Sequence, residues 1–331
     1  MTAPENLVEI WRGSLLESIH TGHVVVCGPD GEIVHNWGNA DALVYPRSSA
    51  KMIQALPLVE SGLAERKRLT DAHLALACAS HNGARIHTDP VQRWLSDLGL
   101  DDAALRCGAH APLDTKERHH LIREGKAPCQ CHNSCSGKHA GFLTLAQSLG
   151  TDLEYADPEH AVQKAVFQAI DEVTQFASPC FGIDGCAAPN PATTVHAMAR
   201  AMAFFASADS NGDARSRAAV RLRNAMMQFP ELVAGEGRPC TRLMRACQGK
   251  AAIKFGAEGY FIAILPEQQL GVALKISDGS TRAANCAIAA ILVKLGVLNP
   301  NHLEAQAYIN EPIKNWRGMQ TGWMRTAATL Q

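Results

Sequence analysis

The chain has 331 residues, 47% of them hydrophobic and 19% charged, and its formal net charge is −1. This composition is that of a compact globular protein and excludes a disordered chain. The near-neutral charge and the 5% aromatic content argue against a nucleic-acid partner, and no apolar run reaches the roughly 18 residues that a membrane span needs.

The N-terminal part of the chain is predicted to form strands. Residues 24–27 and 32–38 are short strand-like runs joined by Gly28-Pro29-Asp30-Gly31, a turn sequence that favours a hairpin. From residue 50 onward apolar residues recur at steps of three and four, which indicates a helix that Pro57 is expected to bend.

The middle of the chain is predicted to be mostly helical. Asp157-Pro158 and Asn190-Pro191 have the form of helix starts, because proline is common in the first turn of a helix. Segments with helical spacing or composition cover residues 71–79, 89–98, 139–149, 158–175, 191–208 and 214–228.

Strand character returns at residues 251–255, 259–265 and 270–276, and an apolar helical pattern follows at 281–295. We expect strands from both chain ends to share one antiparallel sheet flanked by helices, which is an α+β fold. A single domain, 1–331, with two lobes is predicted: a sheet lobe of about 1–50 and 250–331, and a helical lobe of about 51–249. A ligand cleft between the lobes is the expected site.

Eleven cysteines are many for this length, and a secreted protein would normally pair them. The first ten residues, MTAPENLVEI, lack the basic and apolar regions of a secretory signal peptide. We therefore expect a cytoplasmic protein whose cysteines are mostly free thiols, buried as small hydrophobic residues.

Three short motifs follow one another along the chain. Ser48 and Lys51 form S-x-x-K, Ser80-His81-Asn82 is an S-x-N triplet, and Lys254-Phe255-Gly256 is a K-x-G triplet. In this order they are the three elements of serine β-lactamases and penicillin-binding proteins. The separation of Ser48 from Ser80 is shorter than we expect for those enzymes.

These motifs point to a serine nucleophile with a lysine base. A serine hydroxyl attacks only after a base takes its proton, and a lysine is that base only when its amine is neutral. Residues three apart share a helix face, so Lys51 would lie beside Ser48, and Lys254 would form a second pair with Ser80. The sequence leaves both Ser48 and Ser80 open as the attacking serine. We favour Ser48, because a hydroxyl at a helix N-terminus gains N–H groups for a developing anion.

The segment from Cys129 to His139 is the densest polar cluster in the sequence, with thiols at 129, 131 and 135. Thiolates and imidazoles suit zinc, so we expect a metal or substrate site here; a turn-rich loop with incidental thiols is the alternative. Cys186, in a glycine-rich loop close to Asp184, is the expected distant ligand.

Four stretches together, Tyr45–Lys51, Cys78–Gly83, Cys131–His139 and Gly182–Cys186, resemble the rhizobial-type (class 3) L-asparaginases. The resemblance covers most of the chain, and the Cys-Ser-Gly-Lys-His block is its specific part. It implies a serine β-lactamase-like fold and a cytosolic homodimeric amidohydrolase that converts L-asparagine to L-aspartate and ammonia.

The resemblance also implies roles for particular residues. Ser48 and Lys51 would be one catalytic tandem, and Ser80 would pair with a late lysine, Lys254 or its rival Lys250. One zinc ion per chain would aid substrate binding rather than generate the attacking water, held by Cys135, Lys138 and Cys186. A lysine ligand must be neutral, so the metal has to lower its pKa.

An amino-acid substrate needs a cation for its carboxylate and an anion for its ammonium group. Arg47 and His139 are expected to supply the first and Asp184 the second, and His81 and Asn82 are also assigned to substrate binding. Two alternatives stay open: another amide or penicillin-type hydrolase on this fold, and a thiol-rich zinc-binding or redox-responsive protein without catalysis.

Overall fold

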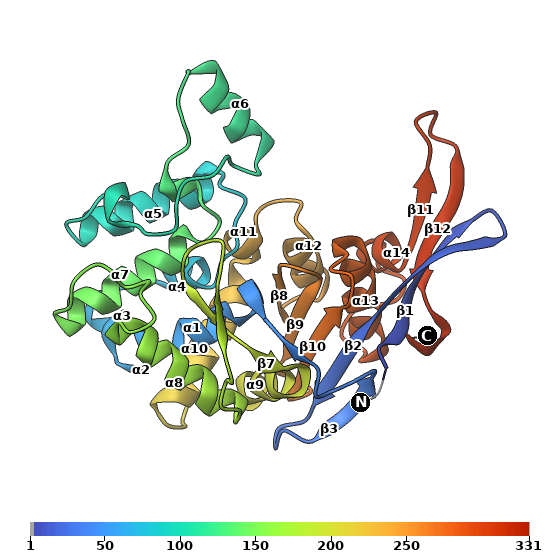
Figure 1. Cartoon of the computed structure of the whole chain (residues 1–331), viewed down its shortest axis with the longest axis horizontal. Coiled ribbons are helices and arrows are strands. Elements are labelled where there is room, and N and C mark those ends of the chain that lie inside the picture. The colour runs from blue at the N-terminus through green and yellow to red at the C-terminus, as the bar shows by residue number, and fades with distance from the viewer. Residues whose placement is uncertain (1–2, 331) are drawn as a thin grey trace. The chain divides into compact units, whose positions relative to one another are not determined.

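The structure is a computed structural model that describes residues 3–330, and the chain divides into two compact units (Figure 1). The sheet unit takes the chain up to residue 49, residues 193–207 and the chain from 242 onward. The helical unit takes residues 50–192 and 208–241. The predicted lobes differ from these units in two places, since residues 193–207 belong to the sheet unit and the late boundary falls at 242.

The sheet unit contains an eight-stranded sheet in the order β11-β12-β1-β2-β10-β9-β8, with β3 pairing to β2 off this path. All of its strand pairs are antiparallel. Its strands are β1 (Glu5–Arg12), β2 (Leu15–Cys27), β3 (Ile33–Trp37), β8 (Ala252–Gly256), β9 (Tyr260–Leu265), β10 (Leu270–Ile276), β11 (Asn310–Lys314) and β12 (Gln320–Thr326).

Strand β2 joins the two chain ends, because it pairs with β3 and with β10, placing Val25 opposite both Asn36 and Ala273. The predicted N-terminal hairpin and the predicted shared sheet are therefore confirmed. The three late strands are confirmed as well. Strands β11 and β12, which form a hairpin beside β1 (Figure 1), were not predicted.

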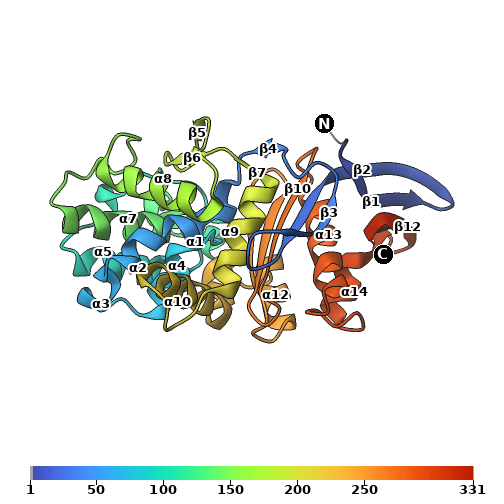
Figure 2. The ribbon, with the colours of Figure 1, turned by 90° about the horizontal axis from the view of Figure 1, so that it is seen from below.

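Helices cover both faces of this sheet. Helix α9 (Val195–Ser207) packs on one face and α13 (Thr281–Lys294) on the other (Figure 2). Strands covered on both faces have near-continuous apolar sequences, as β9 does. A Cβ at Gly271 would lie 2.0 Å from the Ala203 nitrogen, so the α9 backbone rests directly on β10.

Smaller elements complete the sheet unit. Helix α14 (Leu303–Ile309) packs beside α13, and β4 (Leu43–Val44) pairs with β7 (Thr193–Thr194). Two short 3-10 turns are η1 (Arg47–Ala50) and η4 (Ala328–Leu330). The α+β fold class, with an antiparallel sheet from both chain ends and flanking helices, is confirmed.

The helical unit is organised around α7 (Ser136–Leu149), which is buried from Ser136 to Ala146. Burial of consecutive residues on every face is the pattern of a central helix. The other elements are α1 (Lys51–Gln54), α2 (Leu56–Glu60), α3 (Leu63–Arg66), α4 (Asp71–Ala77), α5 (Arg85–Asp97), α6 (Thr115–Arg123), α8 (Ala161–Thr174), α10 (Ala214–Gln228), α11 (Pro230–Ala234), η2 (Asp102–Ala104), η3 (Gln130–His132), β5 (Phe181–Ile183) and β6 (Pro189–Pro191). The chain passes from the helical unit back to the sheet unit within α12 (Pro239–Ala246).

The predicted helices exist, but both proline-based starts are wrong. Helix α8 begins after His160, whose ring accepts the Val162 N–H, and Pro191 lies in strand β6. Pro57 does break the early helix, since α1 ends at Gln54 and α2 carries the proline in its first turn. None of the helices in residues 3–330 is both long and apolar enough to cross a membrane.

Candidate active site

The S-x-x-K motif lies in a tight turn where η1 leads into α1. Arg47 has a φ of 52°, in the left-handed region that non-glycine residues rarely adopt. Ser49 is fully buried, and its hydroxyl donates to the Pro46 carbonyl at 2.6 Å. Ser48 is half-buried, so of the two adjacent serines it is the one that solvent reaches.

The K-x-G triplet ends β8, the edge strand of the sheet, next to this turn in the same unit. A Cβ at Gly256 would lie 2.5 Å from the Pro46 carbonyl oxygen, so only glycine lets the strand approach so closely. The side chain of Lys254 is fully buried, and its amine donates to the Phe255 carbonyl at 2.8 Å. Lys250, its rival, is exposed and lies 3.9 Å from Glu267.

In the helical unit, Lys51 meets Ser80. The Lys51 side chain is 1% exposed, and its amine donates to the Ser80 hydroxyl at 2.9 Å and to the Ala79 carbonyl. It also lies 3.1 Å from the sulfur of Cys135. The sequence placed Lys51 beside Ser48, and in the structure its amine contacts the hydroxyl of Ser80.

Backbone pairing fixes the segment that carries Ser80. The Ser80 N–H donates to the Val233 carbonyl at 2.8 Å, and the His81 N–H donates to the Ser134 carbonyl at 3.1 Å. The segment leaves α4, which packs closely on α7. At their contact, a Cβ on Gly137 would lie 2.3 Å from the Leu76 carbonyl oxygen.

The other two residues of the S-x-N triplet have protein partners. The Nε2 atom of His81 contacts the Ser136 hydroxyl at 2.9 Å, and Nδ1 accepts the Gly83 N–H at 3.1 Å. Burial, with the nearby His87 and Lys51, holds the pKa of His81 well below its usual value. His81 is therefore a neutral residue that supports the segment, with neither ring nitrogen left for a substrate.

Asn82 also turns partly inward. Its Oδ1 atom accepts the Ala84 N–H at 3.3 Å, and its amide packs against Gly235, whose φ is 112°. A Cβ at Gly235 would lie 2.5 Å from the Asn82 amide carbon, so the glycine is required there.

The three residues assigned to zinc come together inside the helical unit. The amine of Lys138 lies 3.1 Å from the sulfur of Cys186, and the thiol of Cys135 hydrogen-bonds to Cys186 as well. That hydrogen bond and the positive charge of Lys138 lower the pKa of Cys186 well below its usual value. The hydrogen bond to Cys186, and then burial, raise the pKa of Cys135 to about 12.

This donor set fits a zinc ion. Two sulfurs and one amine are soft or borderline donors that suit zinc. Burial lowers the pKa of Lys138, but the neighbouring Cys186, Cys135 and Asp184 outweigh it and raise that pKa overall. Lys138 must therefore lose a proton to bind metal, and metal binding at this set would release protons.

His139 offers an unused donor next to these residues. Its Nδ1 atom lies 2.9 Å from the Tyr155 hydroxyl, which itself accepts the Arg106 N–H at 2.7 Å. Because the hydroxyl oxygen already accepts one N–H, we assign its proton to Nδ1, which places the His139 proton on Nε2. Within residues 3–330, that buried Nε2 atom has no hydrogen-bond partner. Tyr155 was not singled out in the sequence, where no motif marks it.

Asp184 and Cys186 share one tight turn. The Asp184 N–H donates to the Ala188 carbonyl at 3.0 Å, and the Ala187 N–H donates to the Asp184 carbonyl at 2.8 Å. Ala187 has a φ of 66°. The turn follows β5 and holds the half-buried Asp184 carboxylate close enough to influence Lys138.

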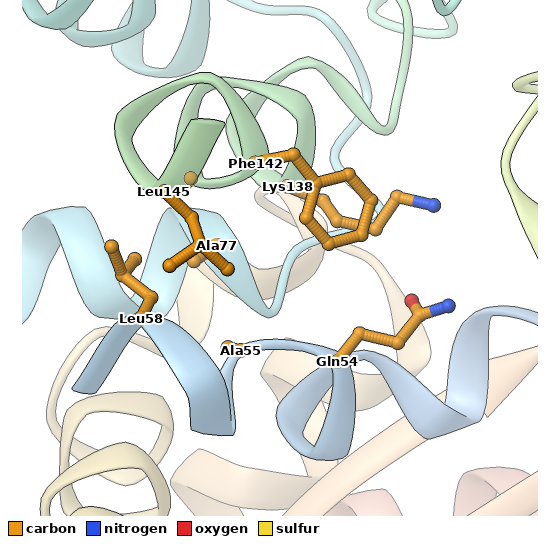
Figure 3. A pocket seen from close by; sticks show the side chains of 8 residues that line it. Gln54, Ala55, Leu58, Ala77, Lys138, Phe142 and Leu145 are labelled. Carbon is orange, nitrogen blue, oxygen red and sulfur yellow. The ribbon is translucent and has the colours of Figure 1, made fainter. Parts of the chain in front are cut away.

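A small recess of about 10 Å³ opens beside Lys138 (Figure 3). Leu58, Ala77 and Leu145 form its apolar side, while the polar ends of Gln54 and Lys138 point away from them. A pocket for a small molecule is normally several hundred Å³. This recess is therefore a packing gap next to the candidate metal ligands and not a substrate pocket.

Comparison with known families identifies the family of the chain. The family model described as L-asparaginase II matches residues 8–326, so the chain belongs to the L-asparaginase II family. A search of curated protein sequences finds no match.

Solved structures show more distant similarity. The protein Mglu in its tris and glutamate form has a TM-score of 0.48 and 13% identity, over 85% of this chain and 60% of that one. A β-lactamase from Mycobacterium bovis has a TM-score of 0.43 and 14% identity, over 82% and 94%. A probable glutaminase from Bacillus subtilis complexed with 6-diazo-5-oxo-L-norleucine has a TM-score of 0.38 and 10% identity, over 84% and 85%. The chain spans only 60–66% of the length of three Mglu chains that it matches.

Proposed function

We propose that this protein is an amidohydrolase, an L-asparaginase that hydrolyses L-asparagine to L-aspartate and ammonia through a serine ester. The observation that carries the proposal is the buried contact of 2.9 Å between the Lys51 amine and the Ser80 hydroxyl. It occurs in a chain that belongs to the L-asparaginase II family. A buried lysine beside a serine hydroxyl is what a Ser-Lys mechanism needs.

We assign the attack to Ser48. Its hydroxyl is half-buried, whereas Ser80 is 5% exposed and Ser49 is committed to the Pro46 carbonyl. Lys51, one helical turn along from Ser48, would take the proton of the attacking hydroxyl. Ser80, which Lys51 contacts, would pass that proton to the leaving ammonia, and water would then hydrolyse the aspartyl ester.

Lys254 is our choice for the second lysine. A base must be shielded from water to be held neutral, and Lys254 is fully buried whereas Lys250 is exposed. The contact of Gly256 with the Pro46 carbonyl supports this choice, because it packs the end of β8 against the turn that carries Ser48.

For substrate recognition we propose the roles that the residue types suggest. Arg47 and the free Nε2–H of His139 would bind the α-carboxylate, and Asp184 would bind the α-ammonium group. Asn82 would contact the substrate with its amide N–H₂. The buried, unpartnered Nε2 atom supports the role of His139.

We further propose one zinc ion, held by Cys135, Lys138 and Cys186. When bound, it would supply a positive charge that strengthens the binding of an anionic substrate group. The chain's own residues carry out the proton transfers. The convergence of the three donors and the low pKa of Cys186 support this proposal.

A homodimer in the cytoplasm completes the proposal. Trp316, Trp323 and Leu303 are exposed on the β11–β12 hairpin and α14, which supports an association surface in the sheet unit. The free thiols of the eleven cysteines support a reducing compartment. Light scattering of the purified protein would give its mass in solution.

Ammonia release from L-asparagine tests the proposed function. We expect turnover of L-asparagine, loss of turnover in Ser48→Ala, and normal turnover in Ser61→Ala, an exposed serine of the helical unit. A penicillin-type hydrolase would instead leave L-asparagine intact and become acylated by a β-lactam. A protein that does neither, yet binds zinc, would support the non-catalytic alternative.

A further inference from the structure

A second thiol cluster lies in the helical unit, apart from the candidate zinc ligands. The sulfurs of Cys129 and Cys131 and a carboxylate oxygen of Asp102 lie within 4.8 Å of one another. In the described part of the chain, no other set of three histidine, cysteine or acidic side chains is grouped this tightly. The proposed function makes no use of it.

Asp102 fixes the backbone around the two cysteines. Its Oδ1 atom accepts the Cys131 N–H at 2.8 Å, and its Oδ2 atom accepts the Gln130 N–H at 3.1 Å. Burial raises the pKa of Asp102, but these hydrogen bonds outweigh it and lower that pKa overall. The carboxylate therefore anchors η3, and both of its oxygens are already in use.

Cys129 has the surroundings of a reactive thiol. Its sulfur lies 3.2 Å from Nδ1 of His132, an atom that also accepts the Cys129 N–H at 3.1 Å and can take the thiol proton. Nε2 of the same ring lies 3.9 Å from the Glu117 carboxylate. Hydrogen bonds from Cys131 and His132 lower the pKa of Cys129. The hydrogen bond with Cys129 raises the pKa of His132. Thiol, imidazole and carboxylate thus follow one another, an order that favours a thiolate.

The thiols of Cys129 and Cys131 differ in exposure and in pKa. Cys129 is half-buried and open to small reagents, whereas Cys131 is fully buried. The hydrogen bond to Cys129, followed by burial, raises the pKa of Cys131, so it keeps its proton. An accessible thiolate next to a protected thiol is the arrangement of redox-sensing cysteine pairs.

We propose that Cys129 and Cys131 form a reversible, peroxide-sensitive dithiol, in which Cys129 reacts first and Cys131 resolves it. The Cys129 thiolate attacks one oxygen of hydrogen peroxide; the O–O bond breaks, and a sulfenic acid and hydroxide form. The Cys131 sulfur then attacks the Cys129 sulfur, the S–O bond breaks, and the disulfide forms. The Cys129 proton and the Cys131 proton end in two water molecules, so peroxide is reduced as the two thiols are oxidised.

The pair is connected to the candidate active site. The Ser136 hydroxyl donates to the Cys131 carbonyl at 3.0 Å and contacts His81 at 2.9 Å. Disulfide formation brings the two sulfurs to about 2 Å, and we infer that η3, which carries Cys131 and its carbonyl, shifts when they join. The effect on catalysis rests on the proposed function. There, the shift disturbs the segment that carries Ser80 and lowers turnover until the disulfide is reduced.

Peptide mass spectrometry after one equivalent of hydrogen peroxide tests the proposal directly. We expect a Cys129–Cys131 disulfide that dithiothreitol reverses. Cys131→Ser should stop at a sulfenic acid on Cys129, which dimedone traps, and Cys129→Ser should give no disulfide. Disulfides between other cysteines, or dimedone labelling unchanged in Cys129→Ser, would overturn the proposal.

Alkylation rates give a matched control on the unmodified protein. Cys180 is exposed, whereas Cys129 is half-buried, so accessibility alone predicts that Cys180 reacts first. With a thiolate held by His132 and Cys131, we expect Cys129 to react with iodoacetamide about 10-fold faster than Cys180 at pH 6. Faster reaction at Cys180 would contradict the proposal.

The alternative to a redox-active dithiol is a metal site formed by Asp102, Cys129 and Cys131. Zinc that is retained through gel filtration, lost in Cys129→Ser and protective against peroxide would overturn the dithiol assignment and favour a metal site. The disulfide readout needs no turnover. A protein that forms the disulfide but releases no ammonia would therefore refute the proposed function and leave the dithiol intact.

Discussion

The amine of Lys51 lies 2.9 Å from the hydroxyl of Ser80, and both side chains are almost fully buried. The same amine lies 3.1 Å from Cys135, one of the candidate zinc ligands. Lys51 therefore joins two features that the sequence suggested separately: Ser80 of the S-x-N triplet and Cys135 of the cysteine-rich block.

Replacing Lys51 by methionine tests its role as the base. Methionine keeps most of the volume of the buried stem but cannot accept a proton, so we expect kcat to fall by about 10²–10⁴-fold with a much smaller change in KM. Lys250→Met, an exposed lysine of the sheet unit, is the control and should behave like the wild type. Turnover within two-fold of wild type in Lys51→Met would rule out the assigned role.

Zinc content tests the proposed metal ligands. Because Cys186 is one of three donors, Cys186→Ser should lower the bound zinc from about one ion per chain, measured by inductively coupled plasma mass spectrometry. Cys180→Ser, in the same region but exposed, is the matched control and should retain the metal. Equal zinc in both variants would show that the ion, if bound, has other ligands.

The contact between α4 and α7 can be tested with two glycines of one helix. A Cβ at Gly137 would lie 2.3 Å from the Leu76 carbonyl oxygen, whereas one at Gly141 would meet Leu58 at 3.4 Å. We expect Gly137→Ala to lower the free energy of unfolding by about 1–3 kcal/mol and to lower turnover, since α4 leads to Ser80. Gly141→Ala should change both much less. Similar denaturation curves for the two variants would contradict this close packing.

The stacked rings of His81 and His87 predict how stability depends on pH. Their centroids are 4.7 Å apart, and burial lowers the pKa of each ring. At pH values above about 6.5, the pKa of a histidine in the unfolded chain, both rings are neutral in the folded and in the unfolded protein. Their burial then costs no stability through protonation. As pH falls below 6.5 toward the lowered folded values, the unfolded chain binds protons first, so the free energy of unfolding decreases.

Urea denaturation at a series of pH values would measure this effect. His87→Gln keeps a donor near the Glu231 carbonyl, which His87 Nε2 contacts at 2.8 Å, but removes one titrating ring. The variant should lose less stability than the wild type between pH 7 and pH 5. An unchanged slope would mean that other groups cause the acid sensitivity.

Much of the fold was predictable, because periodic apolar patterns and turn residues encode it locally. The helix at residues 214–228 has the predicted bounds, and β8, β9 and β10 lie where their apolar runs indicated. Strand β11 escaped prediction because its residues are largely exposed. Strand β12 escaped because the residues that it buries, Gly322, Met324 and Thr326, do not form an apolar alternation in the sequence. The helix starts predicted at Pro158 and Pro191 were wrong, because a proline after a polar residue also occurs in turns and edge strands.

The candidate site was predictable as a set of residues but not as a set of contacts. The sequence marked five residues as candidates, and these lie together in the helical unit: Lys51, Ser80, Cys135, Lys138 and Cys186. It could not show that Lys51 contacts Ser80, since that contact depends on how α1 lies against the segment that follows α4. Nor could it show that both nitrogens of His81 are used within the protein, because hydrogen-bond partners far apart in sequence leave no local signal.

The most direct test of the Ser-Lys account is the rate of ammonia release from L-asparagine by the wild type and by Ser48→Ala, with Ser61→Ala as the control. The account predicts turnover in the wild type and in Ser61→Ala, and a loss of at least about 10³-fold in Ser48→Ala, because no ester can form without the attacking hydroxyl. Equal turnover in the wild type and Ser48→Ala would contradict it.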